Sequence, residues 1–149
     1  MAIILDDGSF EIGNSFVIVS DIEEYAELRA ESGWTGNTSN DAKEAAAIRA
    51  FDYFKIISWS STAFASGIPV RIKEAQIKAA IKELTSPGVM QPTEESNIKR
   101  KRIEGAIETE YFEASRFTGK IHNDILNLIK PYLAITESTI RSTRHLVRR

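Results

Sequence analysis

Four segments of the chain carry apolar residues at the spacing of an α-helix, and turn-forming residues separate them. The expected helices cover residues 20–33, 41–57, 69–84 and 121–134. A capping box, Ser20-Asp21-Ile22-Glu23, marks the start of the first helix, and Ser39 or Asn40 can cap the second. Pro69 suits the first turn of the third helix, and Pro131 should bend or shorten the last turn of the fourth. The pattern predicts a small helical bundle.

The apolar stripe of each helix gives the expected core. The inward-facing residues are Ile22, Tyr25, Ala26 and Leu28 in the first helix, Ala47, Ile48, Phe51 and Phe54 in the second, Val70, Ile77, Ala80, Ile81 and Leu84 in the third, and Ile121, Ile125, Leu128, Ile129 and Tyr132 in the fourth. Helices two to four can bury their stripes only against each other. Phe51, Ile77, Ile81, Ile125 and Leu128 should therefore share one core.

The segments between and around the helices have their own patterns. Residues 1–19 contain two short extended apolar runs separated by turn formers, which indicates an N-terminal arm or an edge hairpin. Serines and a glycine break the helical period in residues 58–67, and residues 85–97 are the clearest linker. Residues 98–112 are typical of a β-hairpin that turns at Glu104-Gly105. We expect a mainly α domain over residues 1–135 and a C-terminal arm over residues 136–149.

Length and composition restrict the class of protein. The chain has 149 residues, which fits a single hydrophobic core. No apolar run reaches the ~18 residues of a membrane span, and the N-terminus does not resemble an export signal, so we expect neither a membrane nor a secreted protein. Cysteine is absent, which is compatible with assembly in a reducing cytoplasm.

The charges are unevenly placed although the net charge is only -2. One arm of the expected hairpin carries Lys99, Arg100, Lys101 and Arg102, and the other carries Glu108 and Glu110. Opposite charges on paired strands attract, so these residues are expected to contact the neighbouring strand or another subunit. Contact with DNA phosphates is the less favoured alternative.

The last residues of the chain form a second basic segment, which cannot bury enough apolar surface to order itself. A partner must therefore order it, and an acidic groove on a partner protein suits it better than DNA. The expected docking residues are Ile140, Arg141, Arg144, His145, Leu146, Val147, Arg148 and Arg149.

Residues that would carry catalysis or bind a metal are not grouped in any known motif. The two histidines, His122 and His145, lie in no zinc-binding pattern, and no nucleophile motif is present. Gly8 and Gly13 match no phosphate-binding loop and are expected in turns. The scattered aromatic residues, among them Trp34, Trp59, Phe64 and Tyr111, favour packing over base stacking. The sequence predicts no enzyme, no metal and no cofactor.

The order of the segments resembles a family of tailed-bacteriophage head-to-tail connector, or adaptor, proteins that are often labelled DnaT-like single-stranded DNA-binding proteins. The resemblance covers residues 1–133 and rests on DDGSFEIGNSFVIVSDIEEYAELRA, Trp34, AKEAAAIRAFDYF, IPVRIKEAQIKAAIKEL and KRKRIEGAIETEYF. The chain departs from the family at SWSSTAFASG, where many members carry Q-A-L-x-W-P-R and only Trp59 is retained. The basic end RSTRHLVRR has no counterpart in the pattern.

The resemblance implies a virion protein at the junction of head and tail. One copy would take its place in a ring of identical subunits, bind the portal protein, extend the DNA channel and receive a tail or stopper protein. Packaged DNA would pass through the channel with non-specific contact at most. The alternative is a single-stranded DNA-binding protein of phage replication.

Overall fold

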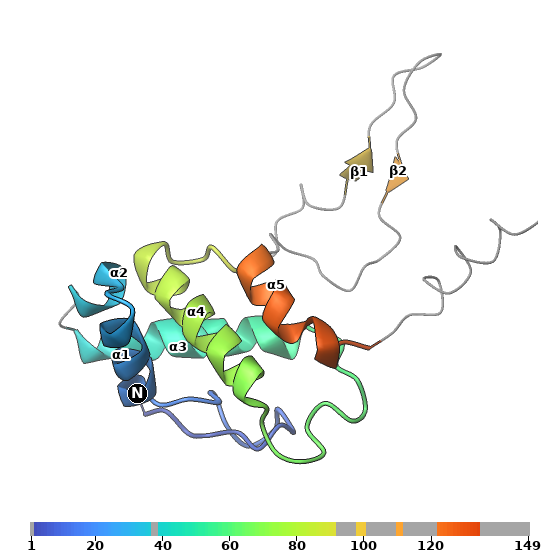
Figure 1. Cartoon of the computed structure of the whole chain (residues 1–149), viewed down its shortest axis with the longest axis horizontal. Coiled ribbons are helices and arrows are strands. Elements are labelled where there is room, and N and C mark those ends of the chain that lie inside the picture. Colours follow the sequence, from blue (N-terminus) through green and yellow to red (C-terminus); the bar gives the residue numbers. More distant parts are fainter. Residues whose placement is uncertain (1, 37–38, 92–97, 101–109, 112–121, 135–149) are drawn as a thin grey trace, which may run out of the picture.

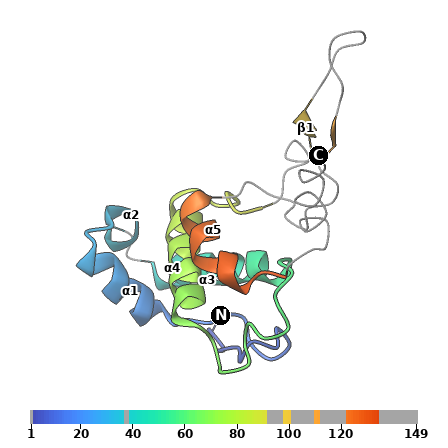
Figure 2. The same ribbon diagram turned by 45° about the vertical axis from the view of Figure 1, so that its right-hand side comes forward.

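The computed structural model describes residues 2–36, 39–91, 98–100, 110–111 and 122–134. It is a small, mainly helical domain, as the sequence predicts (Figure 1). The elements are α1 (Val19–Leu28), α2 (Ser32–Thr35), α3 (Asn40–Lys55), α4 (Val70–Thr85), β1 (Ile98–Arg100), β2 (Glu110–Tyr111), α5 (Asn123–Ile129) and the 3₁₀ helix η2 (Lys130–Tyr132). Helix α4 is central, with α1 and α2 on one side and α5 on the other (Figures 1 and 2). No helix in the described ranges is both long and apolar enough to cross a membrane.

The longest helices, α3 and α4, pack against each other through small side chains. Ser39 caps α3, since its hydroxyl accepts a hydrogen bond from the amide of Ala42 at 3.3 Å. Alanine needs little space, so two helices that meet through alanines approach closely. The fully buried alanines are Ala46, Ala47 and Ala50 on α3 and Ala75, Ala79 and Ala80 on α4.

Aromatic rings fill the core where α3 ends. The ring of Phe51 lies 4.9 Å from that of Phe16, edge to face, and 5.5 Å from that of Phe10. Phe51 is fully buried, and the aliphatic residues Ile77, Ile81 and Ile125 of the same cluster are buried. Leu128 packs against the cluster but stays partly exposed. The five residues expected to share one core therefore do so.

The N-terminal segment packs on the bundle. Asp6 is buried, and its carboxylate accepts hydrogen bonds from the amides of Gly8, Phe10 and Gly13 at 2.8 to 2.9 Å. Burial raises the pKa of this carboxyl, but the amides of Gly13, Phe10 and Gly8 outweigh burial and hold the pKa below its usual value. A Cβ at Gly13 would lie 2.3 Å from the amide nitrogen of Asp6, so only glycine fits there. Gly8 and Gly13 are turn residues, as expected.

Gln76 ties this segment to the two long helices. Its side chain is fully buried on α4, and its Oε1 accepts from the amide of Phe16 at 2.8 Å. Its Nε2 donates to the hydroxyl of Ser15 at 2.8 Å and to the carbonyl of Ala47 at 3.2 Å. A buried amide whose hydrogen-bonding groups are used fixes the register of the segment against both helices.

The first helix differs most from the prediction. Helix α1 begins one residue before Ser20, and the carboxylate of Asp21, not Glu23, accepts from an N-terminal amide, that of Ile18, at 3.2 Å. The helix stops at Leu28, and a separate turn, α2, buries Trp34 completely. Ile22 and Ala26 are buried as expected, but Leu28 is 77% exposed because the bundle covers only one narrow stripe of this short helix. The expectation that Leu28 faces inward is wrong.

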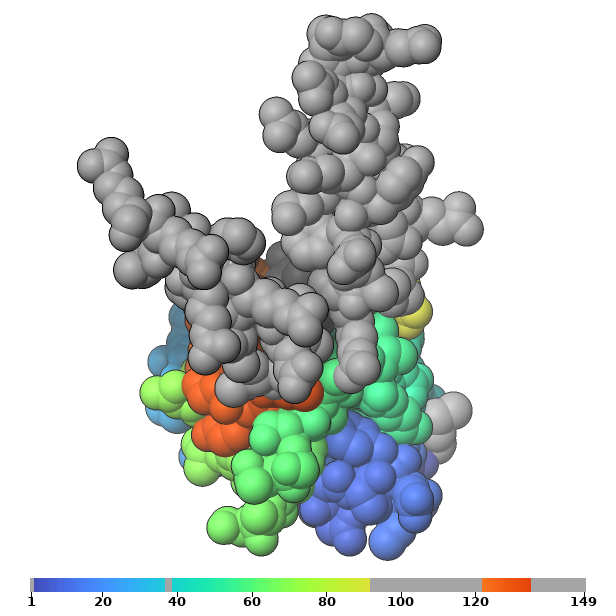
Figure 3. All heavy atoms as spheres, turned by 90° about the vertical axis from the view of Figure 1, so that its right-hand side faces the viewer, coloured from blue at the N-terminus to red at the C-terminus, as the bar shows by residue number. Residues whose placement is uncertain are grey.

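Most of the stripe residues predicted in α4 and α5 pack in the core, and Val70 is the exception among those that the structure describes. Val70 is 79% exposed, because it stands in the first turn of α4 where the neighbouring helices no longer cover it, and its assignment to the core is wrong. Pro131 ends α5, and the chain continues as η2, which confirms the expected shortening. The bundle surface in Figure 3 brings together α5 with η2, residues after α3 and the N-terminal segment. There Trp59 bridges to Leu133.

Candidate nucleic-acid interface

The basic arm of the expected hairpin lies in β1. Strands β1 and β2 pair antiparallel, with Ile98 opposite Tyr111 and Arg100 opposite Glu110. The register therefore sets one basic position across from one acidic position, as the sequence predicts. Lys99 also belongs to β1, whereas Lys101, Arg102, Glu108 and the turn at Glu104-Gly105 lie outside the described residues. Both strands lie outside the helical bundle (Figures 1 and 2).

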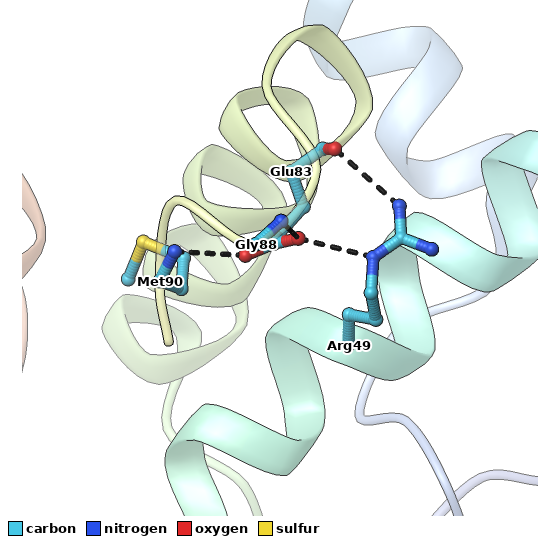
Figure 4. A network of polar contacts seen from close by, with 4 residues as sticks. All are labelled: Arg49, Glu83, Gly88 and Met90. Carbon is cyan, nitrogen blue, oxygen red and sulfur yellow. Dashed lines mark hydrogen bonds and ion pairs between the residues drawn. The ribbon is translucent and has the colours of Figure 1, made fainter. Parts of the chain in front are cut away.

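A buried carboxylate near the end of α4 binds the backbone of the residues that lead from α4 toward the hairpin. Glu83 is fully buried, and it accepts hydrogen bonds from the amide of Gly88 at 2.9 Å and from that of Met90 at 2.8 Å (Figure 4). Arg49 of α3 donates from Nε to the same carboxylate at 3.0 Å and from Nη2 to the Glu83 carbonyl at 3.4 Å. Gly88 has φ +84°, a conformation that favours glycine. Residues 86–91, expected to be a polar linker, are thus fixed to the bundle, and Met90 is buried in its core.

The chain returns from the hairpin to the same end of α4. Lys82, the residue before Glu83, lies 3.4 Å from the carboxylate of Asp124 in the first turn of α5. Burial raises the pKa of Asp124, but the positive charge of Lys82 leads the contributions that hold it below its usual value. Two adjacent residues of α4 therefore contact the chain on either side of the hairpin: Glu83 binds the residues before it, and Lys82 pairs with Asp124 after it.

The C-terminal extension starts elsewhere. The amide of Ala134 donates to the carbonyl of Ser58 at 3.0 Å, and the amide of Ser60 donates to the carbonyl of Tyr132 at 2.8 Å. These bonds attach the last described residues to the segment that follows α3. Residues 135–149, with all eight expected docking residues, lie outside the described part of the chain.

The aromatic residues that could stack bases are used for packing. Trp34 is fully buried. Trp59 stacks on Phe54 at 5.9 Å, lies edge to face with Phe64 at 5.4 Å, and donates from Nε1 to the Phe54 carbonyl at 3.0 Å. The expectation of packing is confirmed for these tryptophans and for Phe64. These three side chains are therefore engaged in packing and are not presented for stacking on bases.

The described residues contain no group of histidines and carboxylates that could hold a metal ion. Glu23, which is adjacent in sequence to Glu24, forms an ion pair with Lys43 at 2.8 Å. His122 directly precedes α5 and is half-buried, and His145 lies outside the described residues.

The sequence reading missed Glu83 and Gln76, although a signal was present. Ile72, Gln76, Ala79 and Glu83 follow one another at three- and four-residue steps along one face of α4. A glutamine and a glutamate on an otherwise apolar face indicate buried polar groups that require partners. The partners themselves could not be read from the spacing, since three of them are the backbone amides of Phe16, Gly88 and Met90, which lie outside the helix.

Comparison with known proteins assigns the C-terminal part of the chain to a family. Residues 58–149, more than half of the chain, match the family described as "Putative DnaT-like ssDNA binding protein". No curated protein and no solved structure gives a significant match. The match agrees with the DnaT-like label that the sequence resemblance suggested. It does not test the expected role as a head-to-tail connector. It includes the basic end RSTRHLVRR, so the expectation that this segment has no counterpart in the family is wrong.

Proposed function

The chain belongs to the family of DnaT-like ssDNA binding proteins, and we propose that it binds single-stranded DNA through the phosphate backbone. The observation that carries the proposal is that the family match coincides with the basic part of the sequence. Residues 58–149 contain 15 Lys and Arg against 10 Asp and Glu, whereas residues 1–57 contain 4 against 11. Positive charge is the main requirement for binding a phosphate backbone, whatever its sequence. No catalytic step is proposed.

The proposed contact is centred on Lys99, Arg100, Lys101 and Arg102. Lys99 and Arg100 belong to β1, which lies outside the bundle, and Lys101 and Arg102 follow them directly in sequence. Four consecutive cations can follow the phosphates of a flexible strand. The described tryptophans are buried or packed, so base stacking, which adds about 1 to 3 kcal/mol per base elsewhere, is not available from them. We expect binding that tolerates any base sequence and weakens steeply with salt.

The salt dependence gives a quantitative test of this contact. Changing Lys99, Arg100, Lys101 and Arg102 to glutamine should make the slope of log K against log salt less steep by about 3, at about 0.7 per lost phosphate contact. Fluorescence anisotropy of a labelled oligothymidylate at several salt concentrations measures the slope. A matched control neutralises four exposed cations of the bundle, Arg29, Lys55, Arg71 and Lys73, and should leave the slope unchanged. Equal slopes for the hairpin variant and the unaltered chain would rule the hairpin out as the contact.

A second candidate function is the head-to-tail adaptor of a tailed bacteriophage. It is favoured by the attachment points, because the hairpin segment is held at Lys82 and Glu83 on α4, while the basic extension follows Ala134, which is hydrogen-bonded to Ser58. A subunit with separate attachment points for two projecting segments suits contacts on both sides of a ring. In this role the chain would sit in the virion between portal and tail proteins, with its own copies as neighbours.

Attachment to phage heads separates the two candidates. An adaptor should join portal-containing heads at a salt concentration that abolishes binding to oligothymidylate, since protein docking buries apolar anchors that salt does not weaken. Deleting residues 141–149 should leave the circular dichroism spectrum unchanged but prevent this attachment. Co-sedimentation with heads measures it. Attachment of the shortened chain at the normal level would count against the docking role of Arg141, Arg144, Leu146 and their neighbours.

A further inference from the structure

A surface groove of about 230 Å³ runs between α1 and α4. Its walls are Tyr25 and Arg29 from α1 and Val70, Lys73, Glu74 and Ile77 from α4. The Arg29 guanidinium covers the Tyr25 ring at 3.7 Å, and the Tyr25 hydroxyl donates to Glu74 at 3.4 Å. The groove is therefore ordered, with an apolar interior and charged groups at its rim.

The groove opens beside apolar side chains that the bundle leaves uncovered. Val70 on its wall is 79% exposed. Leu28, one helical turn from Tyr25 on α1, is 77% exposed. Single exposed apolar residues are common, but a groove flanked by two of them is typical of a surface that another segment covers.

Exposed carboxylates give α1 a negative surface next to the groove. They are Asp21, Glu24 and Glu27, and Glu24 directly precedes Tyr25 of the groove wall. The segment that fits such a surface must combine small apolar side chains with positive charges. Residues 140–149, IRSTRHLVRR, have this composition, with three aliphatic residues, four arginines and no acid.

We propose that residues 140–149 dock in the groove between α1 and α4 of the same chain. Leu146 and Val147 occupy the apolar interior beside Val70, and the flanking arginines pair with the carboxylates of α1. Guanidinium groups suit this task because they bind carboxylates in a bidentate manner.

The chain length allows this contact within one molecule. Ala134 is held to Ser58, and the twelve residues from Ser58 to Val70 cannot separate these points by more than about 40 Å. Leu146 lies twelve residues after Ala134, so an extended chain carries it about 40 Å from that point, which equals the largest possible separation. A tethered segment meets its site at an effective concentration in the millimolar range, which favours its own groove over that of a second copy.

The consequence is competition for the basic end. Arginines paired with α1 cannot contact a phosphate or a portal protein at the same time, so the acidic half of the chain restrains its basic half until a partner displaces it. The docking itself does not depend on the proposed function, and its test uses no DNA.

Disulfide trapping tests the docking, because the full chain contains no cysteine of its own. We expect the pair Val70→Cys and Leu146→Cys to form an intramolecular disulfide at least ten times faster than the pair Ile56→Cys and Leu146→Cys under the same mild oxidation. Ile56 is the matched control, because it is 44% exposed and lies two residues from Ser58, to which Ala134 at the base of the extension is hydrogen-bonded. An undirected segment would therefore reach Ile56 at least as readily as Val70.

The outcomes are distinct on a non-reducing gel. A monomer of increased mobility for the Val70 pair, slowed by adding Glu24→Lys and Glu27→Lys, supports docking within one chain. A disulfide-linked dimer would overturn the proposal in favour of a second copy as donor. Equal rates for the two pairs, or no disulfide with either, would overturn docking in the groove altogether.

Discussion

Replacing Phe51 by alanine should lower the free energy of unfolding by about 3 to 5 kcal/mol. Phe51 is fully buried, and its ring contacts those of Phe10 and Phe16, so its removal leaves a cavity between α3 and the N-terminal segment. The loss combines the transfer free energy of the ring with the cost of the cavity, because helices that meet through alanines have little room to close it.

Urea denaturation followed by circular dichroism measures this loss as a shift of the midpoint. Ile56→Ala is the control, since Ile56 lies at the end of the same helix and is 44% exposed, and it should cost under about 1 kcal/mol. A loss below about 1 kcal/mol for Phe51→Ala would mean that the ring does not lie in a close-packed core.

The helices and most of the core could be predicted because their signal is local and repeated. Every turn of α3 and α4 presents apolar residues to the same side, so an error at one position does not change the assignment. Phe51, Ile77, Ile81 and Ile125 come from three helices, α3, α4 and α5, and meet in one core as expected. The Ser39 cap was equally local, since the hydroxyl and the amide that it binds are three residues apart.

The errors fall where the neighbours of a helix, and not its own pattern, decide exposure. Leu28 and Val70 lie at helix ends, at positions that would be buried if α1 and α4 were covered over their full length. A periodic stripe gives the direction in which a residue points but not how far the opposing element extends. Trp34 was assigned to packing, yet the short helix that buries it carries too few residues to show a period.

The candidate interface was predictable in charge but not in attachment. The cations at 99–102 and the opposite sign of the second arm are explicit in the sequence, and the register that places Arg100 across from Glu110 agrees with them. The attachment depends on Glu83 and Lys82 contacting groups five to forty-two residues away in sequence. Such partners follow from the folded path of the chain, which no local pattern contains.

Replacing Glu83 by alanine should lower the free energy of unfolding by about 3 kcal/mol, because breaking a buried ion pair leaves its partners without compensation. The amides of Gly88 and Met90 would lose their acceptor, and the guanidinium of Arg49 would lose its carboxylate. The Arg49 side chain is 34% exposed, so water can solvate part of it, which places the loss at the lower end of the range for such pairs.

The same substitution should also free residues 86–91, which lead from α4 toward the hairpin, from the bundle. We expect the amide protons of Gly88 and Met90 to exchange with solvent at least tenfold faster in Glu83→Ala, whereas exchange in the middle of α3 changes only as far as global stability does. Glu83→Gln keeps one carbonyl acceptor, so the exchange rates of these amides should lie between those of Glu83→Ala and those of the unaltered chain. Asp52→Ala is the control, since it removes an exposed ion pair with Lys55 at 3.5 Å and should cost under about 1 kcal/mol. If Glu83→Ala were as mild as Asp52→Ala in both measurements, the buried carboxylate would not be what fixes residues 86–91 to the bundle.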